Sequence, residues 1–449
     1  MTLILGIGAR ERSTVTAPVT RLPRPLVKLL IAVKRVVLRV FRSALLRYVR
    51  AEPDPSLDAD RKVYILLVSA WGMGGTIRAA INLAGYLADH KDVEIVSTYR
   101  RRDEPYFAFD PRVKVTPLDD EREGATPPHL RPLRALLRRI PSALYHPADI
   151  RKHNHSLWTD IRLVRLLRGA RGVVIGSRPG HNILVADLKV PGLVGIGLEQ
   201  MNLRSHGKNL RRAMLSHYHD LDGLAVLTEQ DREDYATAMN GTAPPMWRIP
   251  NTVARVEPPR ADLSAKRIFA AGRYTGQKGY DYLIQAFAPV ARAHPDWELK
   301  VCGAGHARKR MQAWIDDEGI GEQAILAGPT DDVPGEMAQA SIYALSSRFE
   351  GFPLVLVEAM SKGMACVAFD CPTGPADIID DHRNGLLVPP KDVEGLTAAL
   401  MEMVEDEELR RRCGDAALET ARDYTMAAIG PKWDEMLQAL LRERAQRGG

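Results

Sequence analysis

The chain has 449 residues, 45% of them hydrophobic and 26% charged, with a formal net charge of +6. This length exceeds one ordinary domain and the composition is typical of a globular protein, so two domains with additional segments are expected. The basic excess lies in residues 1–60, which hold eleven Lys and Arg against five Asp and Glu. The near-neutral remainder argues against a nucleic-acid-binding domain, and no nucleic-acid partner is expected.

The four cysteines form no C-x-x-C pair and no zinc-ligand pattern with histidines, which favours a reducing, cytoplasmic compartment without disulfides or structural zinc. Neither Asp119-Asp120 nor Asp331-Asp332 has D-x-D spacing. No metal site is therefore expected. The cysteines are Cys302, Cys366, Cys371 and Cys413.

Residues 21–50 contain basic residues and no acidic one. On a helix, apolar residues from Leu26 to Tyr48 share one face. The opposite face is expected to carry the basic residues Lys28, Arg35, Arg39, Arg42 and Arg50. Charges interrupt the apolar runs too often for a spanning helix, and no signal-peptide pattern is present. The segment predicts a basic amphipathic helix on an anionic membrane surface. The alternatives are a helix docked on the body and a disordered arm. Residues 52–60 resemble a linker.

The first domain begins with a buried-strand pattern over residues 63–68, a glycine-rich turn over 72–76 and a helix over 77–87. The turn fits neither the dinucleotide fingerprint nor a Walker loop. Gly74 and Gly75 are therefore predicted to bring backbone close to a ligand, and a plain tight turn is the alternative.

Polar residues follow later strands of this domain. Residues 93–98 and 113–117 are predicted strands, and residues 119–152 are expected to form a loop with a short helix. The polar cluster His153-Asn154-His155 has no third partner in the sequence, which predicts a solvated loop. The strand over 173–177 leads to a polar loop with Arg178 and His181, followed by a predicted helix over 183–188, and the strand over 194–197 leads to Glu199. Because ligands bind beyond the carboxyl ends of strands in open α/β sheets, these three are candidate acceptor-side residues. A structural or solvated role is the alternative for each.

The second domain is expected over residues 253–425, and the Pro-rich stretch Glu257-Pro258-Pro259 is the predicted inter-domain connection. A strand over 268–273 ends in a loop with Arg273, Lys278 and glycines, and two cations there suit a diphosphate. Residues 299–305 repeat the pattern of a strand followed by a glycine turn. Further strands, over 324–328, 342–345, 365–369 and 386–388, alternate with helices, which predicts a parallel, doubly wound sheet.

The stretch Ser347–Met360 contains two carboxylates, Glu350 and Glu358, separated by an apolar run. A strand is expected to end near Ser346 and a helix to begin near Leu354, just after a proline. Both carboxylates then face one cleft, and the N–H groups of residues 351, 352 and 354 are available to phosphate. The pattern indicates a phosphorylated sugar ligand. The alternative is an ordinary amphipathic helix with two solvated glutamates.

These motifs together resemble the retaining nucleotide-sugar glycosyltransferases of the GT-B fold, of the family four type. The resemblance covers residues 266–400 strongly and 61–252 more loosely, and residues 1–60 lie outside it. It implies an α/β protein with two Rossmann-like, doubly wound domains facing each other across a cleft. Residues 61–252 would be the acceptor domain and 253–425 the nucleotide-sugar domain. The helix in residues 426–449 would cross back to the first domain.

The resemblance also implies roles for single residues. Glu350 would hold sugar hydroxyls, Glu358 the ribose, and Arg273 and Lys278 the diphosphate. Many relatives place a histidine just after the fourth strand, near the anomeric carbon, and here either Arg178 or His181 takes that place. The other positions matched to nucleotide-sugar binding are Gly272, Gly303, Gly305, Gly351, Phe352 and Leu354, and Gly74 and Gly75 match a turn near phosphate and acceptor.

The expected function is retaining transfer of a hexosyl or N-acetylhexosaminyl group from a UDP-linked sugar, the co-substrate, without metal or cofactor. The acceptor would be a cell-envelope glycan, polymer or lipid-linked acceptor, and the enzyme would be peripheral at the inner face of the plasma membrane. Two alternatives remain: a GT-B sugar-nucleotide epimerase and a non-catalytic nucleotide- or glycan-binding scaffold. The sugar, the base and the acceptor stay open.

Overall fold

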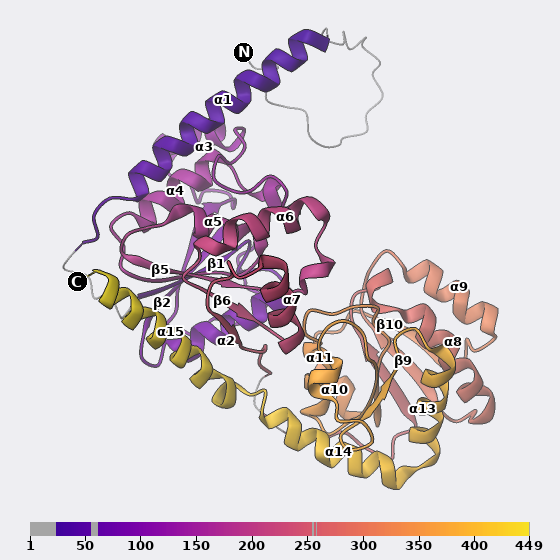
Figure 1. Ribbon diagram of the computed structural model, residues 1–449. Coiled ribbons are helices and arrows are strands. Elements are labelled where there is room, and N and C mark those ends of the chain that lie inside the picture. The colour runs from indigo at the N-terminus through magenta and orange to yellow at the C-terminus, as the bar shows by residue number, and fades with distance from the viewer. Residues whose placement is uncertain (1–23, 55–61, 254–255, 257, 449) are drawn as a thin grey trace. The chain divides into compact units, whose positions relative to one another are not determined.

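The computed structural model describes residues 24–54, 62–253, 256 and 258–448. Parts of the predicted basic segment and linker (residues 1–23 and 55–60), and Glu257 of the predicted inter-domain connection, lie outside these residues. The chain folds as two compact units. The first comprises residues 1–198, 208–224 and 437–449, and the second comprises residues 199–207 and 225–436 (Figure 1).

The first sheet has seven strands in the order β3-β2-β1-β4-β5-β6-β7. The pairs β1–β2, β2–β3, β1–β4 and β4–β5 are all parallel. The central strands are almost wholly buried, as expected for near-continuous apolar runs covered on both faces. The strands are β1 (Lys62–Leu67), β2 (Asp92–Arg100), β3 (Lys114–Asp120), β4 (Gly172–Gly176), β5 (Leu193–Leu198), β6 (Gly223–Val226) and β7 (Met246–Arg248).

Helices connect these strands, and local signals explain where several begin. Ser156 and Thr159 form a capping box at the start of α4, Thr228 caps α7, and Pro179 occupies the first turn of α5. The helices are α1 (Arg24–Val49), α2 (Gly75–Leu87), α3 (Arg131–Arg138), α4 (Leu157–Leu167), α5 (Pro179–Leu188), α6 (Lys208–His217) and α7 (Glu229–Met239).

The second sheet has six strands in the order β10-β9-β8-β11-β12-β13, and every neighbouring pair is parallel. One core cluster, which includes Phe287, Leu299, Met311 and Leu400, packs between this sheet and its helices. The strands are β8 (Arg267–Ala271), β9 (Glu298–Cys302), β10 (Ala324–Gly328), β11 (Ile342–Leu345), β12 (Ala365–Phe369) and β13 (Leu386–Val388).

The helices that follow β8 are α8 (Tyr280–Ala293), α9 (Arg308–Glu318), α10 (Val333–Ala338), α11 (Leu354–Met360), α12 (Pro375–Ile378), α13 (Val393–Glu405), α14 (Glu407–Arg422) and α15 (Met426–Gly448). A short 3-10 turn, η5 (Gly276–Lys278), precedes α8. Helix α15 contributes residues from Leu437 onward to the first unit, where Arg444 Nη1 donates to the Leu193 carbonyl at 2.6 Å.

Both sheets reverse their strand order at one place, between β1 and β4 in the first and between β8 and β11 in the second. Ligands of doubly wound sheets bind beyond the carboxyl ends of the strands at this switch point. The segments after β1 and β4, including the first turns of α2 and α5, carry Gly74, Gly75, Arg178 and His181, and the segments after β8 and β11 carry Arg273, Lys278 and Glu350. The topology therefore brings each group of sequence candidates to the place where a ligand is expected.

The predicted fold class, two doubly wound α/β sheets, is confirmed. Two of the differences in element boundaries concern residues singled out in the sequence. Strand β3 continues to Asp120, whose carboxylate pairs with Arg122, so these acids extend the sheet edge. Helix α5 begins at Pro179 rather than near Ile183, which places His181 inside its first turn.

Helix α1 is present in the predicted basic segment, and part of it packs on the first unit. Val49 is fully buried, and Arg42 and Arg50 contact α5. The apolar side chains Val33, Val36, Val37, Val40 and Phe41 are 38–63% exposed. No helix in the described part of the chain is long and apolar enough to cross a membrane.

Candidate functional site

An ion pair lies at the switch point of the second sheet. Lys278 Nζ is 2.8 Å from Glu350 Oε1, and both side chains are at most 15% exposed. Ser347 donates its hydroxyl to the same oxygen at 2.5 Å. Because the second oxygen of Glu350 is outside these contacts, this carboxylate can accept a further hydrogen bond from a ligand hydroxyl. The structure thus brings together two predicted residues that lie 72 positions apart in the sequence.

Arg273 follows β8 at the same edge, and its side chain is exposed. Across the described ranges, no hydrogen bond or ion pair occupies its guanidinium. A free, planar cation in the same β8–α8 connection as Lys278 is suited to bind a diphosphate. Gly303 explains how the neighbouring turns approach one another: a Cβ there would lie 1.9 Å from the Gly272 carbonyl oxygen, so only glycine fits.

The loops after β8 and β11 are tied together by residues that sequence reasoning missed. Arg348 makes a two-pronged ion pair with Asp281 on α8 and lies 4.3 Å from the Tyr282 ring centre. Gln277 Nε2 donates to the Phe349 carbonyl at 3.1 Å. These contacts join residues about 70 positions apart, and no short-range pattern marks them. They hold Lys278 and Glu350 in one geometry.

The predicted phosphate-facing amides need one correction. The Leu354 N–H donates to the Phe352 carbonyl at 2.8 Å, so it is not available to a phosphate. The N–H groups of Gly351 and Phe352 have no backbone acceptor in the described part of the chain. Glu358 is half-buried in α11.

In the first unit, Arg178 lies at the N-terminus of α5 and is held by Asp149. Its Nε and Nη2 are 3.1 and 2.8 Å from the two carboxylate oxygens. Asp149 is fully buried and also accepts from the N–H groups of Arg151 and Gly180. Burial raises the pKa of Asp149, but the Arg178 charge and the Arg151 N–H outweigh it, and the pKa lies below its ordinary value. Asp149 was not singled out in the sequence.

His181, three residues later, faces the interior and is 2% exposed. Its ring meets Tyr145 and His155 edge-on, each at 5.6 Å, and Tyr145 stacks on His155 at 3.5 Å. The Nδ1 atom of His181 has no hydrogen-bond partner in the described residues. Burial, with the charges of His155 and Arg178, lowers the pKa of His181 well below 6.5, so the ring is neutral at pH 7.

His155 has a defined tautomer. Its Nδ1 lies 3.1 Å from the Arg151 carbonyl, which can only accept, so Nδ1 carries the proton and Nε2 accepts from the Thr98 hydroxyl at 3.1 Å. Burial lowers the pKa of His155 to about 4. The sequence suggested a solvated loop for this histidine, and the structure contradicts this because the ring is 7% exposed.

The turn after β1 is open. Gly74 precedes α2 with φ of 152°, and its carbonyl accepts from the N–H groups of Ile77 and Arg78. A Cβ at Gly74 or Gly75 would meet no atom within 4 Å. The turn therefore leaves room for a ligand beside its backbone.

Glu199 belongs to a separate buried group. It is 2% exposed and lies 3.5 Å from His206 Nε2. Burial is the main cause that raises the pKa of Asp231 to about 7, and the charge of Glu199 adds to this effect. Glu199 falls within the second unit, whereas Arg178 and His181 fall within the first.

Residues 256–420 match the family "Glycosyl transferases group 1". The match covers the site built from Arg273, Lys278 and Glu350, and it ends within α14. The predicted resemblance to this family is confirmed over residues 256–420.

Curated relatives extend the match into the first unit. An exopolysaccharide phosphotransferase of Streptomyces coelicolor is 34% identical over 393 residues, covering 85% of this chain. The chain spans only 41% of that protein's length. The amylovoran biosynthesis glycosyltransferase AmsD of Erwinia amylovora is 26% identical, with 84% of this chain and 99% of that protein covered.

Solved structures share the fold of this chain. A mutant of S. aureus TarM in complex with UDP and α-GlcNAc-glycerol superposes with a TM-score of 0.68 at 16% identity, over 84% of this chain and 99% of that one. The lipopolysaccharide outer core galactosyltransferase WaaB in its apo form gives a TM-score of 0.61 at 19% identity, over 84% and 99%. The predicted GT-B architecture is thereby confirmed.

Proposed function

We propose that this protein is a glycosyltransferase that moves a hexosyl or N-acetylhexosaminyl group from a UDP-linked sugar to a cell-envelope polymer. The observation that carries the proposal is the convergence of Lys278, Glu350 and a free Arg273 at the switch point of a group 1 glycosyltransferase domain. Two cations suit a diphosphate, and a carboxylate suits sugar hydroxyls. Glu358 is assigned to the ribose.

The chemistry proposed is departure of the nucleoside diphosphate from the anomeric carbon. Negative charge grows on the leaving phosphate oxygen as the glycosidic bond breaks, and Arg273 and Lys278 stabilise it. The acceptor oxygen enters on the face from which the phosphate leaves, so the configuration is retained, and the phosphate takes the acceptor's proton. No metal is required by this scheme.

The proposal assigns different roles to Arg178 and His181. Arg178 is committed to Asp149, so it serves to shape the loop after β4. His181 is neutral and its Nδ1 is unpartnered among the described residues, so it is the better candidate to contact a sugar hydroxyl near the anomeric carbon. The turn at Gly74 and Gly75 is proposed to admit acceptor or phosphate.

The acceptor class rests on the relatives. Their names include a poly(glycerol-phosphate) α-glucosyltransferase of Bacillus subtilis and a poly(ribitol-phosphate) α-N-acetylglucosaminyltransferase of Staphylococcus aureus, alongside AmsD. All of these names describe transfer to, or synthesis of, an envelope or extracellular polymer. The UDP assignment rests on fold neighbours that were crystallised with UDP.

Thermal unfolding in the presence of UDP-glucose, UDP-N-acetylglucosamine, UDP-galactose and GDP-mannose tests the donor. A ligand that binds only the folded state at 100 times its Kd stabilises it by about 2.7 kcal/mol, so one UDP-sugar is expected to raise the melting temperature. That sugar is then supplied with poly(glycerol-phosphate) or poly(ribitol-phosphate), and labelled product is measured. A chain that neither shifts with any nucleotide sugar nor transfers one would contradict the proposal. Donor hydrolysis or rearrangement without transfer would favour the epimerase.

We further propose that α1 holds the enzyme at the inner face of an anionic membrane. Its exposed valines and Phe41 suit insertion into the interface, and nearby Lys34, Arg35 and Arg39 suit anionic head groups. The four cysteines are free and buried, consistent with the reducing compartment that this location requires.

Changing both Val36 and Val40 to Asp is expected to reduce binding to phosphatidylglycerol vesicles about tenfold or more, because two exposed apolar contacts become repelled charges. Co-sedimentation at low and high salt measures this, and wild-type binding should weaken as salt rises. Ile325→Asp is the matched control, since Ile325 is 39% exposed on the second unit. Equal sedimentation of the double variant and the control would contradict membrane docking by α1.

A further inference from the structure

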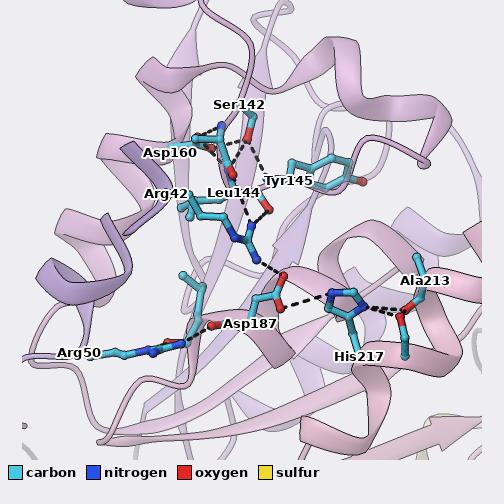
Figure 2. A network of polar contacts seen from close by, with 12 residues as sticks. Arg42, Arg50, Ser142, Leu144, Tyr145, Asp160, Asp187, Ala213 and His217 are labelled. Carbon is cyan, nitrogen blue, oxygen red and sulfur yellow. Dashed lines mark hydrogen bonds and ion pairs between the residues drawn. The ribbon is translucent and has the colours of Figure 1, made fainter. Parts of the chain in front are cut away.

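Helix α1 also reaches into the framework around the candidate site of the first unit (Figure 2). Arg42 Nη2 lies 2.6 Å from Asp187 Oδ2 on α5. Its Nη1 donates to the carbonyls of Ala143 and Leu144 at 3.3 and 3.1 Å. One side chain therefore joins three segments: α1, the end of α5 and the loop that follows α3.

Arg50 reinforces the same junction. Its Nε donates to the Leu188 carbonyl at 2.9 Å and its Nη2 to the Asp187 carbonyl at 2.7 Å. These are terminal carbonyls of α5, which lack partners within the helix, and a cation there is favoured by the helix dipole. Arg42 and Arg50 thus hold the C-terminal end of the helix whose N-terminal end carries Arg178 and His181.

The loop after α3, which contains residues 142–149, is held by hydrogen bonds on two sides. Its N–H groups at Ala143 and Leu144 donate to Asp160 Oδ2 on α4 at 2.7 and 3.3 Å, and Ser142 donates its hydroxyl to Asp160 Oδ1 at 2.7 Å. Its carbonyls face Arg42. Burial raises the pKa of Asp160 to about 6, against the opposing effects of these donors and of Arg42. The peptide groups of this loop are accordingly fixed by a carboxyl group and a guanidinium together.

The residues immediately after this loop touch the candidate site. Tyr145 stacks on His155 and meets His181 edge-on. Asp149, four positions further on, holds Arg178. A shift of the loop relative to α5 would therefore move Tyr145 and Asp149 away from His181 and Arg178.

We infer that Arg42 is a positioning residue: it fixes the loop of residues 142–149 against α5 and so places His181 and Arg178 for the acceptor-side chemistry. The inference rests on the proposed function for its kinetic consequence. Helix α1 then has two functional faces. The exposed apolar face is proposed to contact the membrane, and the inner face, with Arg42 and Arg50, contacts α5.

Arg42→Gln tests the inference. The variant is expected to lower kcat for sugar transfer about tenfold or more, because misplacement by about 1 Å can cost a hundredfold in rate. The KM for the nucleotide sugar should stay unchanged, since the donor contacts are proposed to lie in the second unit. Arg42→Lys keeps the charge toward Asp187 but cannot reach two carbonyls as well, and should recover part of the rate.

Arg47→Gln is the matched control, because Arg47 is exposed on the same helix and its Nε donates only within the helix, to the Ser43 carbonyl. Hydrogen exchange of residues 142–149 and 178–188 supplies a readout independent of activity, and Arg42→Gln should accelerate it while Arg47→Gln does not. Unchanged exchange in Arg42→Gln overturns the inference, as does a rate loss that vanishes after correction for the unfolded fraction. If the wild type transfers no sugar, the proposed function fails, and hydrogen exchange alone decides the positioning role.

Discussion

Lys278→Ala is expected to lower the rate of sugar transfer at least a hundredfold. Lys278 is 15% exposed and lies 2.8 Å from Glu350, beside the exposed Arg273 that we assign to the same diphosphate. Removing one fixed charge that stabilises a developing anion costs about 2.7–4 kcal/mol of transition-state stabilisation. Initial rates with saturating UDP-sugar measure the loss, and circular dichroism checks that the variant is folded.

Lys300→Ala is the control for this prediction. Lys300 also belongs to the second unit and forms a half-buried ion pair, with Nζ 2.6 Å from Glu336 Oε2, but it lies in the middle of β9 rather than at the switch point. If loss of an ion pair as such lowered the rate of sugar transfer, both variants would be slow. Loss of the diphosphate contact lowers the rate only in Lys278→Ala. Equal rates in the two variants would refute the assignment of the site.

Asp149→Ala is expected to lower the free energy of unfolding by about 3–5 kcal/mol, because it leaves the Arg178 guanidinium without its carboxylate. The same change leaves the N–H groups of Arg151 and Gly180 without their side-chain acceptor. Urea denaturation at pH 7 measures the difference from wild type. Because the folded pKa of Asp149 is lowered, its stabilising contribution is present above pH of about 4 and is lost on further acidification.

The comparison for Asp149 is Asp89→Ala in the same unit. Asp89 pairs with Arg112 at 2.6 Å, but these side chains are 61% and 51% exposed. Exposed pairs contribute about 0–1 kcal/mol, so this variant should unfold close to the wild-type midpoint. A stability loss in Asp149→Ala no greater than in Asp89→Ala would show that the buried carboxylate is not a structural anchor.

Much of the second unit could be read from the sequence. The predicted strands at 268–273, 342–345 and 365–369 agree closely with β8, β11 and β12. They are short apolar runs bounded by glycine or polar residues, and this local pattern reflects burial on both faces of a parallel sheet. The predicted start of α11 at Leu354 is also correct, since proline before a helix is a local signal.

Several contacts of the candidate site were not predicted by the sequence patterns. His155 looked like part of a solvated loop, yet its ring is buried between Thr98 and Tyr145. Asp149 carried no motif, yet it fixes Arg178. The Leu354 N–H was predicted to face phosphate, yet its own loop turns it onto the Phe352 carbonyl. Each error concerns which atom is the partner of which, and sequence spacing does not contain that information.

The sequence by itself determined the alternation of strands and helices, the glycine turns, the basic amphipathic helix and the candidate cations and carboxylates, because these depend on local periodicity and side-chain chemistry. Only the tertiary structure decided that Lys278 pairs with Glu350, that Asp149 holds Arg178, and that Arg42 joins α1 to α5. These pairs lie 72, 29 and 145 positions apart. Such contacts form because the strand order of each sheet brings distant loops to one edge, and packing of the helices then selects their partners.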